Sequence, residues 1–184
     1  MGITSRRTMN RCHSRGATAR PPAQLLRLHR HSLSNLLVLG GTESQRLAVA
    51  RAFHRWSPLS QGPFVALDCM FDEPRLWRAL QSWLTAGGPP FGANPLHACR
   101  RGMLYLESVG SLSDPSQRLL LIFARQLEPG SPAVLVEPRP LRLAVGNTED
   151  LSEAVDRRSF SSALYDCLDK IRVEIGRIPK QGVA

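Results

Sequence analysis

Apolar residues follow two spacings along the chain, and these spacings predict a series of strands and helices. Short apolar runs that end at glycine or a polar residue are typical of buried parallel strands. Segments with an apolar residue at every third or fourth position are typical of helices that bury one face. The predicted strands are 35–39, 63–69, 102–107, 141–145 and 171–175. The predicted helices are 47–56, 73–84, 114–127 and 159–168.

The order of these segments predicts an α/β fold. Strands and helices alternate from the first predicted strand to the last, which favours a mainly parallel sheet covered by helices. In such sheets, ligands bind at the carboxyl ends of the strands. Residues 85–95, TAGGPPFGANP, have no apolar period and are rich in glycine and proline, so we expect a loop there.

Basic charge is concentrated near the N-terminus. The chain has 184 residues and a formal net charge of +9, and residues 1–33 contain seven arginines without an acid. We interpret residues 1–33 as a flexible basic leader, residues 34–180 as the folded domain and residues 181–184 as a tail. Contact of the leader with DNA or another anionic surface is the alternative, and a transit peptide is a further one.

The cysteines and the overall hydropathy indicate a soluble cytoplasmic protein. The four cysteines are scattered, without a C-x-x-C pair and without a histidine at ligand spacing. They therefore support neither a zinc site nor a redox motif, and we expect buried, reduced thiols. No apolar run approaches the length of a membrane span, and the start of the chain lacks the apolar core of a signal peptide.

Residues 40–46, GGTESQR, lie between the first predicted strand and the first predicted helix, where a phosphate-binding loop would lie. Such a loop has the pattern G-x-x-x-x-G-K-[ST] and directs backbone N–H groups at phosphates. Here Gln45 replaces the second glycine, Arg46 replaces the lysine, and Glu43 adds a negative charge. These changes predict a remnant nucleotide pocket without tight ATP binding. Its residues would be Gly40, Gly41, Thr42, Ser44, Arg46 and Glu107.

Four further segments, taken in order along the chain, carry a family resemblance that extends beyond this loop. They are AVARAFHRWSPLSQGPFVALDC, GMLYLESVGSLSDPSQRLLL, RLAVGNTEDL and FSSALYDCLDKIRVEI. From Asn35 to Pro179 the chain resembles the central ATPase domain of the sigma-54-dependent transcription activators, bacterial members of the AAA+ family. The resemblance implies a three-layer P-loop NTPase core with a mainly parallel sheet. The chain ends at Ala184, so we expect no helical lid domain and no DNA-binding helix-turn-helix.

The resemblance also places the residues of the family's hydrolysis chemistry, and this chain departs from them. The aspartate that holds magnesium falls on Glu107, and the glutamate that polarises the attacking water falls on Ser108, which has no basic group. The arginines that the family donates across a subunit interface fall on Ser161 and Cys167. We therefore expect very slow hydrolysis by the usual route.

Two further positions concern nucleotide sensing and the partner. The family's polar sensor residue falls on Thr148, one place after Asn147, and an asparagine after a strand is also a common turn former. Activators of this family contact sigma-54 through a loop with the motif G-A-F-T-G-A. Residues 85–95 replace that longer insertion and keep only Phe91-Gly92-Ala93. Phe91 is the candidate partner contact, and a hydrophobic plug beneath the loop is the alternative.

The resemblance and the departures together favour a pseudo-ATPase. We predict a non-catalytic AAA+ sigma-54 interaction-type domain that regulates transcription through contacts with AAA+ activator subunits or sigma-54 RNA polymerase. It would use no cofactor, or bind ATP or ADP with Mg weakly. The alternative is a weak or divergent ATPase that uses Arg46 and Glu107 in place of lysine and aspartate. A decaying gene product without a partner is the third hypothesis.

Overall fold

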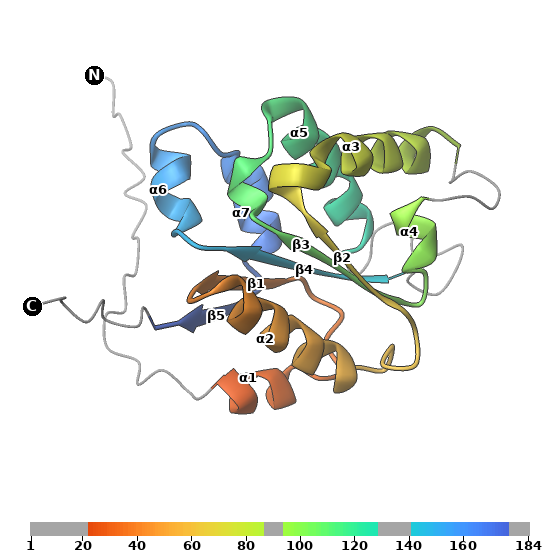
Figure 1. Cartoon of the computed structure of the whole chain (residues 1–184), viewed down its shortest axis with the longest axis vertical. Helices are drawn as coiled ribbons and strands as arrows, with labels where there is room; N and C mark the ends of the chain where they lie inside the picture. Colours follow the sequence, from red (N-terminus) through yellow and green to blue (C-terminus); the bar gives the residue numbers. More distant parts are fainter. Residues whose placement is uncertain (1–21, 87–93, 129–140, 177–184) are drawn as a thin grey trace, which may run out of the picture.

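The computed structural model describes residues 22–86, 94–128 and 141–176 of the chain (Figure 1). Five strands of the described residues form one parallel sheet in the order β2-β3-β4-β1-β5. Their bounds are β1 Leu36–Gly40, β2 Phe64–Asp68, β3 Gly102–Glu107, β4 Leu141–Asn147 and β5 Ile171–Ile175. The predicted α/β fold with a mainly parallel sheet is confirmed.

Helices cover both faces of the sheet and complete three layers (Figure 1). One face carries α1 (Pro22–Leu28) and α2 (Glu43–Arg55). The other carries α3 (Cys69–Ala86), α5 (Asp114–Gln126), α6 (Leu151–Asp156) and α7 (Ser162–Leu168), with the short α4 (Pro95–Ala98) and the 3-10 helix η1 (Val109–Ser111) beside them. Within the described ranges, no helix combines the length and the apolar character that crossing a bilayer requires.

The core lies on both sides of the sheet, and β3 runs through its middle. Met103 and Tyr105 pack in the cluster beneath α1 and α2, whereas Leu104 and Leu106 pack in the cluster beneath α3, α5 and α7. Every residue of β3 is buried. A strand that is covered on both faces carries apolar residues at successive positions, which is why the sequence signal of β3 is a continuous run.

Helix α3 begins at Cys69, four residues before the predicted start, and the reason is local hydrogen bonding. The carboxylate of Asp68 accepts from the backbone N–H of Met70 at 3.0 Å, and that of Asp72 accepts from the N–H of Asp68 at 3.2 Å. These side chains satisfy donors that the first helical turn leaves free. Pro74 therefore lies inside the helix and not at its start.

Three short helices were not predicted. Helix α1 lies in the residues assigned to the leader, and its Leu26 is 2% exposed in the cluster shared with α2. Helices α4 and α6 have four and six residues, too few to show an apolar period. They begin at side-chain caps instead, since Asn94 accepts from the N–H of Leu96 and Asp150 accepts from the N–H of Ser152.

His54 is a buried titratable group on α2. Its exposed fraction is 6%, and its Nε2 donates to the carbonyl of Gly62 at 3.0 Å. Its Nδ1 is buried and finds no hydrogen-bond partner among the described residues. Burial lowers the pKa of His54; the bond to Gly62 raises it in part, and the charges of Arg142 and Arg51 lower it further. The folded protein therefore favours the neutral ring.

This lowered pKa predicts a loss of stability in mild acid. The unfolded chain takes up a proton at its histidines near pH 6.5, whereas folded His54 resists protonation, so the free energy of unfolding falls as the pH drops below about 6.5. We expect His54→Gln, whose amide can still donate to Gly62, to flatten the change between about pH 7.5 and about pH 5.5. Urea unfolding at both pH values measures it. His31→Gln, which replaces an exposed ring, is the control. If the unmodified protein and both variants lost equal stability between the two pH values, His54 would not be the responsible group.

Candidate functional site

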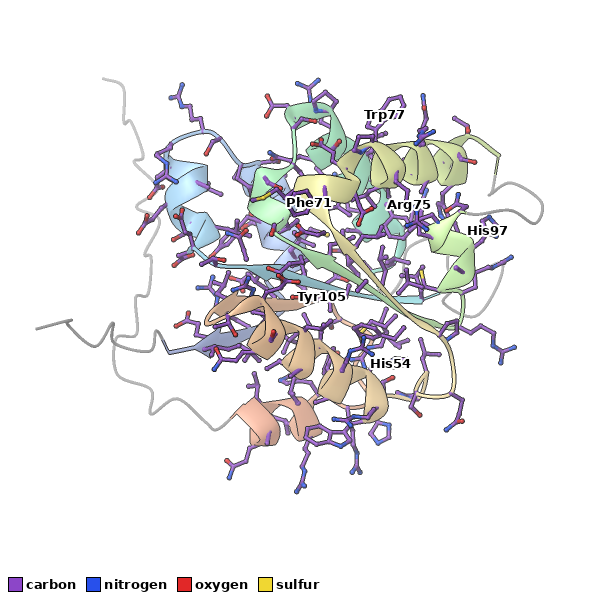
Figure 2. All side chains as sticks on the ribbon, viewed as in Figure 1. His54, Phe71, Arg75, Trp77, His97 and Tyr105 are labelled. Atoms are coloured by element: carbon purple, nitrogen blue, oxygen red, sulfur yellow. The ribbon has the colours of Figure 1, made fainter. Side chains whose placement is uncertain are left out.

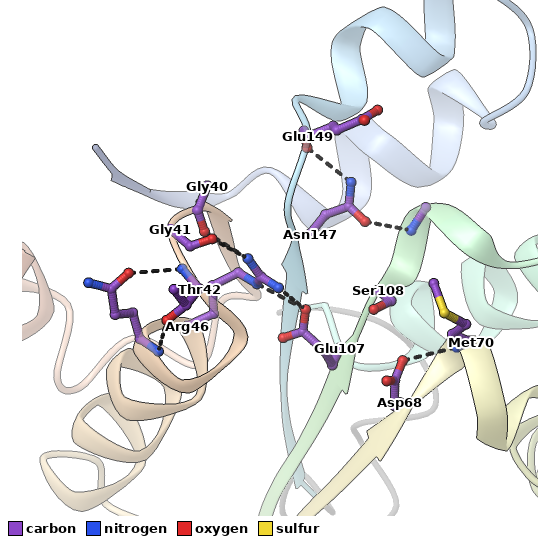
Figure 3. Close-up of polar contacts among 12 residues, drawn as sticks. Gly40, Gly41, Thr42, Arg46, Asp68, Met70, Glu107, Ser108, Asn147 and Glu149 are labelled. Atoms are coloured by element: carbon purple, nitrogen blue, oxygen red, sulfur yellow. Dashed lines mark hydrogen bonds and ion pairs between the residues drawn. The ribbon is translucent and has the colours of Figure 1, made fainter. Parts of the chain in front are cut away.

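The turn between β1 and α2 forms the centre of the candidate site (Figure 3). Gly40 and Gly41 have φ angles of +75° and +60°, which glycine adopts without strain. A Cβ atom on Gly40 would also overlap the carbonyl of Ile175 on β5. The fold therefore requires these two glycines whether or not a ligand binds, because the chain must turn sharply against the neighbouring strand.

Helix α2 begins at Glu43 and not at residue 47, so the prediction of an open loop up to Arg46 is wrong. Thr42 Oγ1 accepts from the N–H of Gln45 at 3.3 Å, and Gln45 Oε1 accepts from the N–H of Thr42 at 2.8 Å. This is a capping box, the reciprocal pairing of a threonine with a glutamine three residues later. Ser44 and Arg46 consequently belong to the first helical turn.

Arg46 points into the protein. Its exposed fraction is 3%, and each of its three guanidinium nitrogens donates a hydrogen bond. Nε and Nη2 donate to Glu107 Oε1 at 2.9 and 2.5 Å, while Nη1 donates to the carbonyls of Gly40 and Gly41 at 2.9 and 3.0 Å (Figure 3). The side chain thus ties the turn after β1 to the carboxyl end of β3.

Glu107 uses both carboxylate oxygens within the protein. Oε1 accepts from Arg46, and Oε2 accepts from the hydroxyl of Tyr105 on the same strand. Glu107 is 4% exposed and Tyr105 is 1% exposed. Gly146 on β4 leaves the space for this pair, since a Cβ there would overlap the tyrosine hydroxyl and lie 2.7 Å from Glu107 Oε2. We call Arg46, Glu107 and Tyr105 the buried network.

The electrostatics of the buried network favour one protonation state. Burial lowers the pKa of Arg46, but the hydrogen bond and the charge of Glu107 outweigh it, so that this pKa rises above its ordinary value. Burial raises the pKa of Tyr105, and its contact with Glu107 raises it further. Arg46 is therefore charged and Tyr105 protonated near neutral pH, and the positive charge is paired inside the chain.

Asn147, one place before the predicted sensor position, makes two structural hydrogen bonds. Asn147 Oδ1 accepts from the N–H of Gly110 at 3.1 Å, and its Nδ2 donates to the carbonyl of Glu149 at 3.0 Å (Figure 3). The side chain fastens the end of β4 to η1. Thr148 is exposed, and Ser108 has a φ of +55° where β3 ends. Asn147 therefore orders the carboxyl edge of the sheet beside Glu107.

The two positions that match the family's arginines lie at the start and near the end of α7. Ser161 Oγ caps the helix by accepting from the N–H of Leu164 at 3.3 Å, so α7 begins at Ser162 and not at residue 159. Cys167 is 3% exposed, and its carbonyl accepts from Asn35 Nδ2 at 2.9 Å. Burial raises the pKa of the Cys167 thiol to about 12. Neither side chain carries a positive charge.

Phe91, the predicted partner contact, lies outside the described residues. Across residues 22–86, 94–128 and 141–176, no group of three or more His, Cys, Asp or Glu is placed to hold a metal ion. Cys69, Cys99 and Cys167 are buried free thiols. The structure thus brings together Gly40, Gly41, Thr42, Arg46 and Glu107 at one edge of the sheet. Tyr105 and Gly146 belong to the same arrangement but carried no motif that would have pointed to them.

Comparison with known sequences gives a family match over most of the chain. The family model described as Sigma-54 interaction domain matches residues 15–174. The anaerobic nitric oxide reductase transcription regulator NorR of Aeromonas hydrophila is 30% identical over 140 residues, 71% of this chain and 27% of that protein. The Nif-specific regulatory protein of Herbaspirillum seropedicae is 26% identical over 154 residues, 78% of this chain and 28% of that protein. The chain spans just over a quarter of the length of these relatives.

Solved structures share the same arrangement of strands and helices. NtrX from Brucella abortus, in complex with ATP, superposes with a TM-score of 0.64 at 21% identity. The match covers 84% of this chain and 36% of the NtrX chain. The P-loop NTPase domain of a sigma-54 transport activator from E. coli superposes with a TM-score of 0.59 at 17% identity, over 84% of this chain and 92% of that domain. At these identities the likeness establishes the fold.

Proposed function

Because the chain belongs to the Sigma-54 interaction domain family and has the AAA+ P-loop NTPase fold, we propose that it is a non-catalytic member that regulates transcription through protein contacts. The expected partners are AAA+ activator subunits or sigma-54 RNA polymerase. The observation that carries the proposal is the position of Arg46, whose guanidinium is bound to Glu107 and to two carbonyls of its own turn.

A phosphate-binding loop functions because its N–H groups and its lysine face the phosphates. In this chain the corresponding cation is paired inside the protein, and the capping box uses the N–H groups of Thr42 and Gln45. A triphosphate that recruited Arg46 would leave Glu107 buried and unpaired. Removing one partner of a buried ion pair costs about 3–5 kcal/mol. This cost opposes nucleotide binding at the turn.

The residues at the end of β3 support the same proposal. A magnesium ion would have to compete for Glu107, which is 4% exposed and already accepts hydrogen bonds at both oxygens from Arg46 and Tyr105. Ser108 has no basic group that could activate a water molecule. The donor set does not fit magnesium, and no hydrolytic step is assigned to it.

The start and end of α7 indicate what such a domain would do among active subunits. Activators of this family supply arginines across the subunit interface, and here Ser161 caps a helix while Cys167 is buried. A copy of this chain in a ring of active subunits would therefore leave its neighbour without that arginine. Loss of such an arginine lowers hydrolysis about 10³-fold or more in related NTPases. We infer a restraining role in the ring.

Titration calorimetry with MgATP tests the proposal. We expect no saturation up to millimolar ATP, because Arg46 is already bound to Glu107 and to the carbonyls of the turn. Micromolar binding that requires magnesium and disappears in Arg46→Ala would instead establish the divergent ATPase. Arg75→Ala is the matched control, since this exposed arginine on α3 lies away from the turn.

A further inference from the structure

Charge is divided unequally between the two faces of the sheet. Residues 22–67, which form α1, β1, α2 and most of β2, contain five arginines and a single acid, Glu43. Most acids of the described residues lie instead on α3, α5, α6, α7 and their connections. The face that carries α1 and α2 is therefore strongly basic, although one of its arginines, Arg46, is buried and paired.

Exposed arginines of α1, of the turn after it and of α2 lie on this face. Helix α2 presents Arg51 and Arg55 one turn apart, and residues four apart lie on the same side of a helix. The members of this basic face are Arg27, Arg30, Arg51 and Arg55. Figure 2 shows side chains tipped by nitrogen extending from α1 and α2 away from the sheet.

Two of these arginines rest on aromatic rings. The guanidinium of Arg27 lies 5.5 Å from the ring centre of Trp56, which links α1 to the end of α2. The guanidinium of Arg51 lies 4.7 Å from the ring centre of Phe64 on the edge strand β2. Stacking restrains a guanidinium while its N–H edge stays available for hydrogen bonds. The positive groups are thus partly preorganised for an anionic ligand.

The chemistry of this face fits phosphate groups in a repeating array. Arginine binds phosphate through two parallel hydrogen bonds, and several arginines over one surface match a polyanion. Among the described residues, Leu28 is the large apolar side chain that this face exposes, with an exposed fraction of 64%. Proteins that insert into a lipid surface present a row of such side chains, so a membrane is the less suitable ligand. Residues 1–21, which precede α1 directly, add five arginines and no acid.

We propose that the basic face binds the phosphate backbone of a nucleic acid without reading its sequence. The cations lie on a broad helical surface, and phosphate contacts of this kind position a protein but carry no sequence information. The state of the nucleotide pocket does not affect this surface, because the basic face lies on the outer sides of α1 and α2. It assigns a second surface to the chain, separate from the carboxyl edge of the sheet.

Fluorescence anisotropy on the full chain, with labelled duplex DNA and duplex RNA of random sequence, tests this proposal. Arg51→Glu/Arg55→Glu is expected to weaken binding by about tenfold or more and to lower the slope of log affinity against log salt by about two. The matched control is Arg75→Glu/Arg78→Glu, which changes the net charge equally on exposed positions of α3. It is expected to weaken binding less than about threefold.

Each other outcome overturns the proposal. Equal losses in both variants would mean that net charge alone attracts the polyanion. Unchanged binding in Arg51→Glu/Arg55→Glu would place the contact elsewhere in the chain. Binding to anionic vesicles without binding to either duplex would identify a lipid surface. Arg51→Lys/Arg55→Lys keeps the charge but loses the paired hydrogen bonds and the stacking, so it must keep the salt dependence and lose less affinity than Arg51→Glu/Arg55→Glu. Thermal unfolding of every variant verifies that the fold is intact.

Discussion

Replacing Glu107 by alanine is expected to lower the free energy of unfolding by about 3–5 kcal/mol. The substitution leaves the guanidinium of Arg46 buried without its counter-charge, and it leaves the hydroxyl of Tyr105 without its acceptor. Both groups are buried in the folded protein, so water cannot replace the hydrogen-bond partner that either has lost. Urea unfolding monitored by circular dichroism measures the change.

A double variant separates the missing charge from the missing volume. Arg46→Met/Glu107→Leu removes both charges and keeps side chains of similar size, and such replacements of buried pairs are often neutral or stabilising. We expect the double variant to regain most of the stability that Glu107→Ala loses. If the two proteins were equally unstable, packing or the unpaired hydroxyl of Tyr105, and not the unpaired charge of Arg46, would account for the loss.

Phe53→Ala is expected to cost about 3–5 kcal/mol of stability. The ring of Phe53 is fully buried in the cluster beneath α1 and α2. The guanidinium of Arg142, a fully buried residue of β4, lies 3.8 Å from its centre. Removing the ring opens a cavity and also takes away the aromatic face on which this cation rests.

The same substitution on the surface is the control for Phe53. Phe71 on α3 is 78% exposed, so Phe71→Ala should change stability by no more than about 0.5 kcal/mol. Figure 2 shows Phe71 at the start of α3, on the other side of the sheet from α2. Chemical unfolding of both variants compares them, and equal losses would contradict the buried position of Phe53.

The buried network cross-links three segments of the fold. Arg46 joins the turn after β1, the first turn of α2 and the end of β3. A bound nucleotide phosphate with its metal ion would bridge the same three segments. The proposal of a non-catalytic domain follows from this equivalence, since a protein side chain provides the cross-link that a ligand would otherwise provide.

Much of the fold could be predicted because the relevant signals are local. Strands β3 and β5 begin and end where the sequence predicted, since continuous or alternating apolar positions mark strands that are covered by helices. Helix starts were less predictable. Thr42 and Asp68 lie in the turn and the strand as predicted, but each also accepts a backbone hydrogen bond that starts the following helix earlier than predicted.

By itself the sequence determined the alternation of strands and helices, the glycines at the turn, and the absence of the usual lysine and arginines. The tertiary structure alone decided the direction of Arg46 and the role of Tyr105. Arg46 and Glu107 are 61 positions apart, and a local pattern cannot specify which distant acceptor a long cation meets. The grouping of arginines on one face was decided in the same way, because α1 and α2 become neighbours only when the sheet has formed.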